Sequence, residues 1–261
     1  MDYINGLLPT AVTPWIAVNE YTRESKRLLF NYEKPESCMA DLITAIAKGE
    51  KVIVHTGGQR ASSQWGTINI EKCLKNKFPS LKILRIDAET VSEKGHPAFG
   101  IIGNLNTVLP LYDIVIASPT LETGVSIDIN HFDRVFGFAT GSQTVSAVCQ
   151  SLARVRADIP RHIWAKPYSN QRIGNGSTDP KLLIKSQQKL FQANLVTLGQ
   201  TQAIAMDSNN PQHLSTWATM SAIQNSGFKA YRESILDKLQ SEGYEIKDGE
   251  ILTTEQKLRR T

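Results

Sequence analysis

The sequence predicts an α/β fold: a parallel sheet with helices on both faces, followed by an all-helical C-terminal extension. Hydrophobic residues make up 41% of the 261 residues, which is enough to bury a sizeable core. Short, continuously apolar runs alternate with helix-compatible segments, and strands of this kind are covered on both faces, as in parallel sheets. The five runs are KVIVH (51–55), LKILRID (81–87), DIVIAS (113–118), RVFGF (134–138) and RHIWA (161–165). They place one α/β domain at about residues 36–168.

Residue spacing predicts the helices that connect these strands. Met39, Leu42, Ile43 and Ile46 recur on one helix face, and Gly49 follows where a helix terminus favours glycine. Three further helix-compatible segments end at about Lys77, cover 101–111, and run from Ser142 to about Arg156.

The N-terminal region is less regular. The runs TAVTPWIAV (10–18) and RLLFNY (27–32) could form strands, but prolines and charges interrupt them. We therefore treat residues 1–35 as a connecting segment.

The region after residue 178 has the pattern of a helical extension. Asp179-Pro180 and Asn210-Pro211 each resemble an N-cap followed by proline at the first helical position. A third helix is predicted from about Phe228 to Glu242, where Gly243 ends it. These signals predict an all-helical extension over residues 179–261.

The composition argues against a disulfide-rich, a metal-binding or a membrane-spanning protein. The 29 Lys and Arg residues against 25 Asp and Glu give a formal charge of +4, which is compatible with a polyanionic partner but does not require one. Cys38, Cys73 and Cys149 are far apart and form no Cys-x-x-Cys pair, so we expect buried, reduced thiols. The five histidines lack metal-ligand spacing, and we expect no metal site. With no secretory signal and no apolar run of about twenty residues, we expect a cytoplasmic protein with no membrane partner.

A glycine loop follows the first predicted strand. Thr56, Gly57 and Gln59 lie here, and glycines allow backbone N–H groups to approach an oxyanion at the start of the next helix. The alternative is a tight strand-to-helix turn with no ligand.

The loop after the third predicted strand is rich in hydroxyl groups. Ser118 and Thr120 stand in the segment SPTLETGVSID (118–128), and Gly124 lies where the chain must bend. Hydroxyls and free amides suit a sugar-phosphate backbone, whose contacts fix register without reading sequence. The alternative is a capped loop that binds nothing.

The helix from Ser142 carries the strongest candidate residues. Gln150 and Arg154 are four residues apart and share a face, whereas Arg156 can join Arg154 only if the helix ends near it. Two guanidiniums and an amide suit a nucleotide γ-phosphate. The alternative is a solvated helix face with an ion pair between Arg156 and Asp158.

These three segments, in this order, resemble the second RecA-like lobe of superfamily-two helicases. VIVHTGGQ is similar to motif IV, ASPTLETGVSID to motif V, and QSLARVR to motif VI of that family. The nearest resemblance is to herpesvirus-type origin-binding helicases and to replication proteins of cyanobacterial plasmids. It covers residues 50–167 well and the helical extension only loosely.

The resemblance implies a role for each candidate residue. Gln150, Arg154 and Arg156 would be the catalytic residues, facing ATP bound by a partner lobe. The loop residues would contact nucleic acid, with DNA favoured over RNA, and Gly124 would couple the two sites. The chain departs from the family in two places. Many members space the arginines three apart rather than two, and Ser126 stands where a ribose-binding Asp often lies.

The sequence contains no G-x-x-x-x-G-K-[ST] segment to hold the β- and γ-phosphates and Mg²⁺. We therefore expect that ATP and Mg²⁺ are bound mainly by the N-terminal RecA-like lobe of a parent protein, and that this chain alone does not hydrolyse ATP. The alternative function is a non-catalytic RecA-like scaffold or nucleic-acid-binding module. A serine hydrolase is disfavoured, because Ser126 lies in GVSID, one residue short of a nucleophile elbow.

Overall fold

The computed structural model describes residues 27–59, 62–119, 126–197 and 211–249. Of these, residues 27–169 and 230–249 form one compact unit, which we call the sheet unit, and residues 170–229 belong to a second, the helical unit. No helix in the described part of the chain has both the length and the apolar character needed to cross a membrane.

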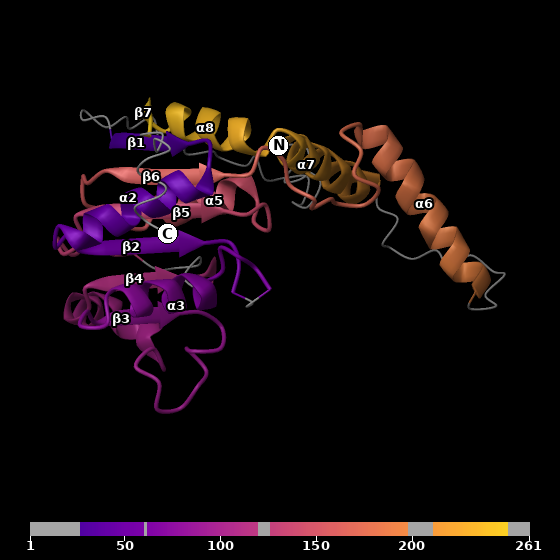
Figure 1. The fold of residues 1–261 in the computed structure, drawn as a ribbon. Coiled ribbons are helices and arrows are strands. Elements are labelled where there is room, and N and C mark those ends of the chain that lie inside the picture. Colours follow the sequence, from indigo (N-terminus) through magenta and orange to yellow (C-terminus); the bar gives the residue numbers. More distant parts are fainter. Residues whose placement is uncertain (1–26, 60–61, 120–125, 198–210, 250–261) are drawn as a thin grey trace, which may run out of the picture. The chain divides into compact units, whose positions relative to one another are not determined.

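The sheet unit is built on a seven-stranded sheet in which every pair of neighbouring strands is parallel, in the order β3-β4-β2-β5-β6-β1-β7 (Figure 1). The strands are β1 (Arg27–Tyr32), β2 (Val52–Thr56), β3 (Ile83–Ile86), β4 (Ile114–Ala117), β5 (Arg134–Ala139), β6 (Arg161–Ala165) and β7 (Tyr244–Asp248). All residues of β2, β4 and β6 are buried, which explains why apolar residues predominate in these strands.

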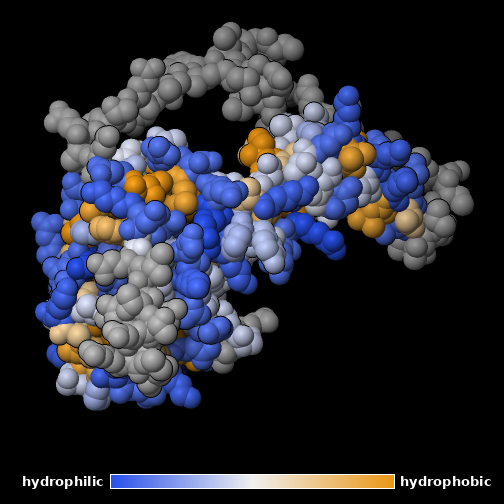
Figure 2. All heavy atoms as spheres, turned by 45° about the horizontal axis from the view of Figure 1, so that its top comes forward, coloured by the Kyte–Doolittle hydropathy of each residue, from blue (hydrophilic) through white to orange (hydrophobic). Residues whose placement is uncertain are grey.

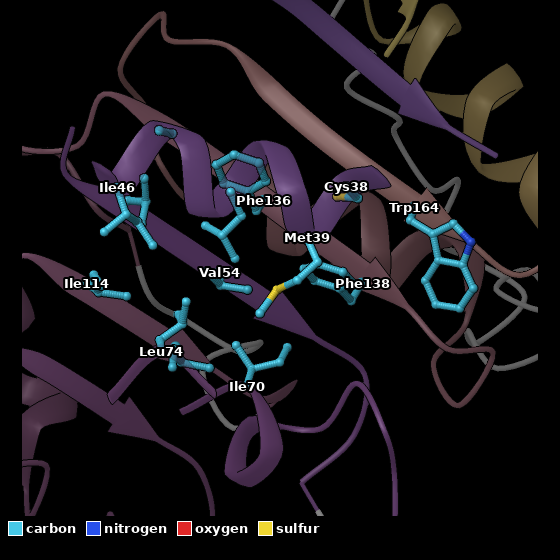
Figure 3. Packing of buried hydrophobic residues seen from close by; sticks show 14 of the residues in the cluster. Cys38, Met39, Ile46, Val54, Ile70, Leu74, Ile114, Phe136, Phe138 and Trp164 are labelled. Atoms are coloured by element: carbon cyan, nitrogen blue, oxygen red, sulfur yellow. The ribbon is translucent and has the colours of Figure 1, made fainter. Parts of the chain in front are cut away.

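The first face of the sheet is covered by α2 (Pro35–Ala47) and α3 (Thr67–Lys77). Leu42 of α2 and Leu74 of α3 are fully buried in one cluster with Val54, Phe136 and Phe138 of the central strands. Figure 3 shows these two helices contributing side chains above the same strands. The 3.6-residue spacing of apolar residues in α2 therefore marks its core face, as predicted.

The opposite face of the sheet is covered by α5 (Val145–Ala153), against which α8 (Tyr231–Ser241) packs. Side chains alternate along a strand, so Gly137 faces away from Phe136 and Phe138 and toward α5. A Cβ atom on Gly137 would lie 3.0 Å from Leu152 Cδ2, so glycine permits the close approach of this helix to the sheet. The predicted α/β class, a parallel sheet with helices on both faces, is thus confirmed.

Three features of the sheet unit differ from the sequence analysis. The run RLLFNY, which the sequence left open as a strand, forms β1, although it lies in the segment expected to be a connection. β7, within the expected helical extension, pairs with β1 as the edge strand. The segment expected to be a helix at 101–111 consists of three short pieces: a 3₁₀ helix (Ile101–Asn104), α4 (Leu105–Val108) and a 3₁₀ turn (Leu109–Leu111). Cys73 is exposed, so the expectation of buried thiols was wrong for this residue.

The helical unit contains α6 (Pro180–Thr197) and α7 (Pro211–Lys229). They pack through Leu183, Ala218 and Ala222, which are buried. The predicted N-cap of α6 is confirmed, because Asp179 Oδ1 accepts a hydrogen bond from Lys181 N at 2.8 Å. The second predicted cap, Asn210, lies outside the described residues.

One buried amide fixes the loop that precedes α6. Asn225 of α7 is 2% exposed. Its Oδ1 accepts from Ile173 N at 2.8 Å, and its Nδ2 donates to the carbonyls of Ile173 at 3.0 Å and Ser177 at 2.9 Å. These three hydrogen bonds hold the loop on α7.

Candidate functional site

The candidate site is assembled from loops at the carboxyl ends of β2, β4 and β5 and from the segment that follows α5. These three strands are neighbours in the parallel sheet, so their carboxyl ends lie at one edge. In open α/β sheets, ligands bind at this edge.

Thr56, at the end of β2, is 3% exposed, and its hydroxyl forms hydrogen bonds within the loop that follows. Its Oγ1 donates to the Trp65 carbonyl and accepts from Gly58 N at 3.4 Å. The loop closes where Thr67 N, at the start of α3, donates to the Gly58 carbonyl at 3.0 Å. Thr56 therefore shapes the loop, and its contact with nucleic acid stays a prediction.

Gly57 lies where two loops come close together. Its N–H donates to the Phe138 carbonyl of β5 at 3.2 Å, and its carbonyl accepts from the Ser142 hydroxyl. A Cβ atom at this position would lie 2.7 Å from Ser142 Oγ and 2.9 Å from Gln143 Oε1. A side chain here would displace the Ser142 hydroxyl and the Gln143 amide, so glycine allows the loops after β2 and β5 to meet in this arrangement.

An open pocket of about 500 Å³ lies between these two loops. Its described lining consists of backbone, hydroxyl and amide groups, with no charged side chain. The lining residues are Gly58, Gln59, Ser62, Ser63, Thr140 and Ser142. Gln59 was predicted at this position, whereas the sequence analysis did not identify the pocket residues of the β5 loop.

The loop after β4 is described only in part. Ser118 is 5% exposed, and its N–H donates to the Ile86 carbonyl of β3 at 2.9 Å. Thr120 and Gly124 lie outside the described residues, and their predicted roles stay predictions.

Beyond that gap, Ile127 joins the end of this loop to the segment after α5. Ile127 N donates to the Arg154 carbonyl, and Arg156 N donates to the Ile127 carbonyl, both at 3.0 Å. This isolated parallel bridge pairs Ile127 with Val155, and both side chains are fully buried. Segments similar to motifs V and VI are thus held together through their backbones.

Two buried arginines from other strands hold the same segment. Arg161 of β6 is fully buried, and its Nη2 donates to the carbonyls of Val155 at 2.7 Å and Ala157 at 2.9 Å. Arg27 of β1 is also buried, and its Nη2 donates to the Arg156 carbonyl at 3.1 Å. With the bond from Ile127, every carbonyl from residue 154 to residue 157 accepts a hydrogen bond.

Arg154 is half-buried and caps the C-terminus of α5, close to His55 of β2. His55 faces the α5 side of the sheet and is 7% exposed, and its buried Nε2 atom has no hydrogen-bond partner among the described residues. Burial, together with the charge of Arg154, lowers the pKa of His55 from its ordinary 6.5 to about 4. His55 is therefore neutral at physiological pH, and it was not singled out from the sequence.

Arg156 lies beyond the helix and its side chain is exposed. Its Nε donates to Ser126 Oγ at 3.2 Å, and that hydroxyl donates to Asp128 Oδ1 at 2.7 Å. Asn106 holds the same turn through bonds to the Ser126 carbonyl at 3.3 Å and from Asp128 N at 3.2 Å. Ser126 and Asp128 thus position Arg156.

α5 ends at Ala153, which meets the condition that the sequence set for Arg156 to lie on the same side as Arg154. Gln150 is exposed on α5, one turn before Arg154. The two arginines have different neighbours, His55 for Arg154 and Ser126 for Arg156. A long-range clamp by Arg27 and Arg161 is the part of this arrangement that sequence reasoning missed, because nothing local marks those arginines as buried.

No protein-family model matches the chain. An uncharacterized protein of Picosynechococcus sp. is 43% identical over 245 residues, which cover 90% of this chain and 24% of that protein. A protein of African swine fever virus, provisionally named a helicase/primase complex protein, is 25% identical over 139 residues, covering 53% of this chain and 12% of the viral protein. The chain thus spans about a quarter or less of the length of these relatives.

Solved structures with a similar fold include domain 2 of the DEAD-box helicase Mss116p bound to an RNA duplex. The TM-score is 0.37 at 10% identity, and the match covers 85% of this chain and 98% of that domain.

Proposed function

We propose that this chain is the C-terminal RecA-like lobe of an ATP-dependent helicase or translocase that acts in replication. In this function it supplies Arg154 and Arg156 to ATP bound mainly by a second, N-terminal RecA-like lobe. Similarity to a viral protein named for a helicase/primase complex supports the replicative role.

One observation carries this proposal: the backbone of residues 154–157 is fixed at every carbonyl while the Arg156 side chain is exposed. Burying Arg27 and Arg161 costs desolvation free energy, which the hydrogen bonds to these carbonyls offset. Groups that stabilise developing charge act best when they are held in place before the reaction. A rigid backbone under a permanent cation has this property.

The donor set fits a nucleoside triphosphate. Guanidinium groups bind phosphate oxygens through a planar fork of N–H donors, and the Gln150 amide adds one further donor. ATP, with its Mg²⁺, would supply the phosphoryl group whose transfer drives translocation. On this chain, Ser126 and Asp128 orient the Arg156 side chain, and His55 lies beside Arg154.

Nucleic acid would follow the loops at the carboxyl edge of the sheet. The pocket around Gly58, Gln59 and Ser142 offers backbone, amide and hydroxyl donors, which suit a sugar-phosphate backbone. Ser118, Thr120 and the glycine loop with Thr56 and Gly57 would complete this surface, and Gly124 would couple it to the nucleotide. The viral relative is named for a helicase/primase complex, and on this ground we propose DNA rather than RNA as the track.

The test compares Arg154→Ala and Arg156→Ala in a protein that contains both lobes. We expect the nucleic-acid-stimulated ATPase rate to fall by at least roughly 100-fold in each variant, because an arginine finger contributes about 10³ or more to such reactions. Binding of a labelled single strand should change less than about twofold. Arg172→Ala, an exposed arginine of the helical unit, is the matched control. Unchanged turnover in both site variants would contradict the proposal.

A non-catalytic scaffold is the second candidate, and the burial of Arg154 beside His55 favours it. If Arg154 is structural, Arg154→Ala will lower the free energy of unfolding while leaving turnover at the level of Arg172→Ala. Measuring urea unfolding on the same samples separates this outcome from a catalytic role, in which turnover falls and stability changes little.

A further inference from the structure

The described part of the helical unit is strongly basic, and the candidate site does not use these charges. Its described residues include Arg172, Lys181, Lys185, Lys189 and Lys229 but a single acidic residue, Asp179. The Asp179 carboxylate caps α6 through its bond from Lys181 N. In the whole chain, by contrast, the 29 basic residues are nearly balanced by 25 acidic residues.

Three of these cations form a stripe along α6. Lys181, Lys185 and Lys189 follow one another at intervals of four residues, and all three are exposed. At about 100° per residue, they and the exposed Gln188 and Gln192 fall within a sector of about 100°. Over residues 180–194, whose side chains the structure describes, this sector contains only lysines and amides. We call it the lysine face of α6.

The lysine face points away from the side on which α6 packs. Leu183, the fully buried residue of α6, contacts Ala218 and Ala222 of α7. On the helical wheel, Leu183 lies about 170° from the centre of the lysine face. Among the described residues, the packing that holds α6 in place is therefore on the opposite side of the helix. In the view of Figure 2, hydrophilic surface extends over the helical unit between separate apolar patches.

Two other helices of the same chain each pair one lysine with an acidic residue. Lys75 of α3 pairs with Glu71 at 2.8 Å, and Lys238 of α8 pairs with Glu242 at 3.2 Å, each four residues apart. Among the described residues, no acidic side chain pairs with the lysine face. Like charges four residues apart repel one another, so an unpaired stripe destabilises α6 unless anions bind it.

We propose that the lysine face of α6 binds the phosphate backbone of single-stranded nucleic acid. The ammonium groups recur about every 6 Å along the helix axis, so a row of phosphates can be contacted one after another. The Gln188 and Gln192 amides donate hydrogen bonds to the same backbone without reading its sequence. This inference extends the proposed function, because it gives the helical unit a part of the nucleic-acid track.

The test measures affinity of the full chain for a fluorescein-labelled oligothymidylate as a function of salt concentration. The variant is K181Q/K185Q/K189Q, and the control is K72Q/K75Q/K77Q, which removes three exposed lysines from α3. Each lysine–phosphate contact contributes about 0.7 to the slope of log affinity against log salt for single strands. The α6 variant should therefore lose about 2 units of slope and bind about 100-fold more weakly at 0.1 M salt, whereas the control should retain most of both.

Three outcomes would overturn the inference. The first is an unchanged salt slope in the α6 variant. The second is an equal loss of affinity in the two triple variants, which would indicate an effect of net charge alone. The third is an α6 variant that loses binding to phosphatidylserine vesicles, measured alongside, but keeps its affinity for the single strand. Each of these leaves the ATPase test of Arg154 and Arg156 unaffected. Conversely, active Arg154→Ala and Arg156→Ala proteins whose strand binding still depends on α6 would overturn the catalytic proposal alone.

Discussion

The fully buried guanidinium of Arg161 donates a hydrogen bond to the Val155 carbonyl at 2.7 Å, which fixes the residue between the two candidate arginines. The same nitrogen donates to the Ala157 carbonyl at 2.9 Å, and Nη1 donates to the Ile159 carbonyl. One side chain thus satisfies three carbonyls in the turn between α5 and β6. The bond to Val155 is buried and those to Ala157 and Ile159 are partly buried, so water can replace a lost donor only in part.

Arg161→Ala should therefore destabilise the sheet unit strongly. Each buried carbonyl left without a donor costs about 1–3 kcal/mol, and the free energy of unfolding should fall by about 3–5 kcal/mol in total. Urea denaturation followed by tryptophan fluorescence measures this change.

Two further variants test whether the lost hydrogen bonds cause this destabilisation. Arg161→Lys retains the charge but cannot span three carbonyls with its single ammonium, and it should recover only part of the loss. Arg172→Ala, at an exposed position, should remain within about 0.5 kcal/mol of the wild type. If Arg161→Ala is as stable as Arg172→Ala, the clamp does not exist in solution.

His55 should make the stability of the protein depend on pH in the mildly acidic range. Its folded-state pKa of about 4 is below the ordinary 6.5, because burial and then the charge of Arg154 disfavour the imidazolium. As the pH falls below 6.5, the unfolded chain takes up this proton first. The contribution is therefore fully present above pH 6.5 and is lost progressively as the pH falls toward 4, at a cost of about 3 kcal/mol.

His55→Asn removes the titrating group and should flatten the dependence of unfolding free energy on pH between 6.5 and 4. Burial also lowers the pKa of His162, so some dependence will remain in the variant. NMR titration of Arg154→Gln should show a raised His55 pKa, since the nearby positive charge is gone. A wild-type His55 that titrates at its ordinary pKa would contradict the buried placement.

Local patterns predicted the centre of the fold and left out its edge. β2, β4 and β6 are buried along their whole length, and apolar residues make up all of β4 and most of β2 and β6. β7 has the sequence YEIKD, and only Tyr244 is buried there, because an edge strand faces solvent along most of its length. Its pairing with β1 joins residues more than 200 positions apart, which no local spacing records.

In the candidate site, too, local signals were predictable from the sequence and tertiary contacts were not. The loop glycines and the Gln150–Arg154 spacing are local signals, and the structure places them at the end of β2 and on α5. The burial of Arg27 and Arg161 follows from tertiary contacts, since an arginine in a sequence gives no sign of being buried. His55 was overlooked because a histidine at the end of an apolar strand is usual in a protein core.

The three cysteines should differ in reactivity. Cys73 is exposed on α3, whereas Cys38 and Cys149 are buried. Burial raises the pKa of the Cys38 thiol, and burial with the charge of Glu242 raises that of Cys149 to about 12. Because only a thiolate attacks a disulfide reagent, Ellman's reagent should titrate one thiol in the native protein and three in 6 M guanidinium chloride. Cys73→Ser should bring the native count to zero. A native count of two or three would show that the core around α2 or α5 opens.

Gly137 and Leu152 should be energetically coupled, since a Cβ atom on Gly137 would lie 3.0 Å from Leu152 Cδ2. Gly137→Ala overpacks a buried contact between β5 and α5 and should cost about 1–3 kcal/mol. Leu152→Ala alone leaves a cavity and should cost about 2–5 kcal/mol. In the double variant the new methyl group enters the space that Leu152 vacates, so the combined loss should be smaller than the sum by about 1 kcal/mol or more.

Gly103→Ala, where an added Cβ meets no atom within 4 Å, is the control and should change stability little. Additive losses in a urea-denaturation cycle would show that α5 does not pack on β5 at this position.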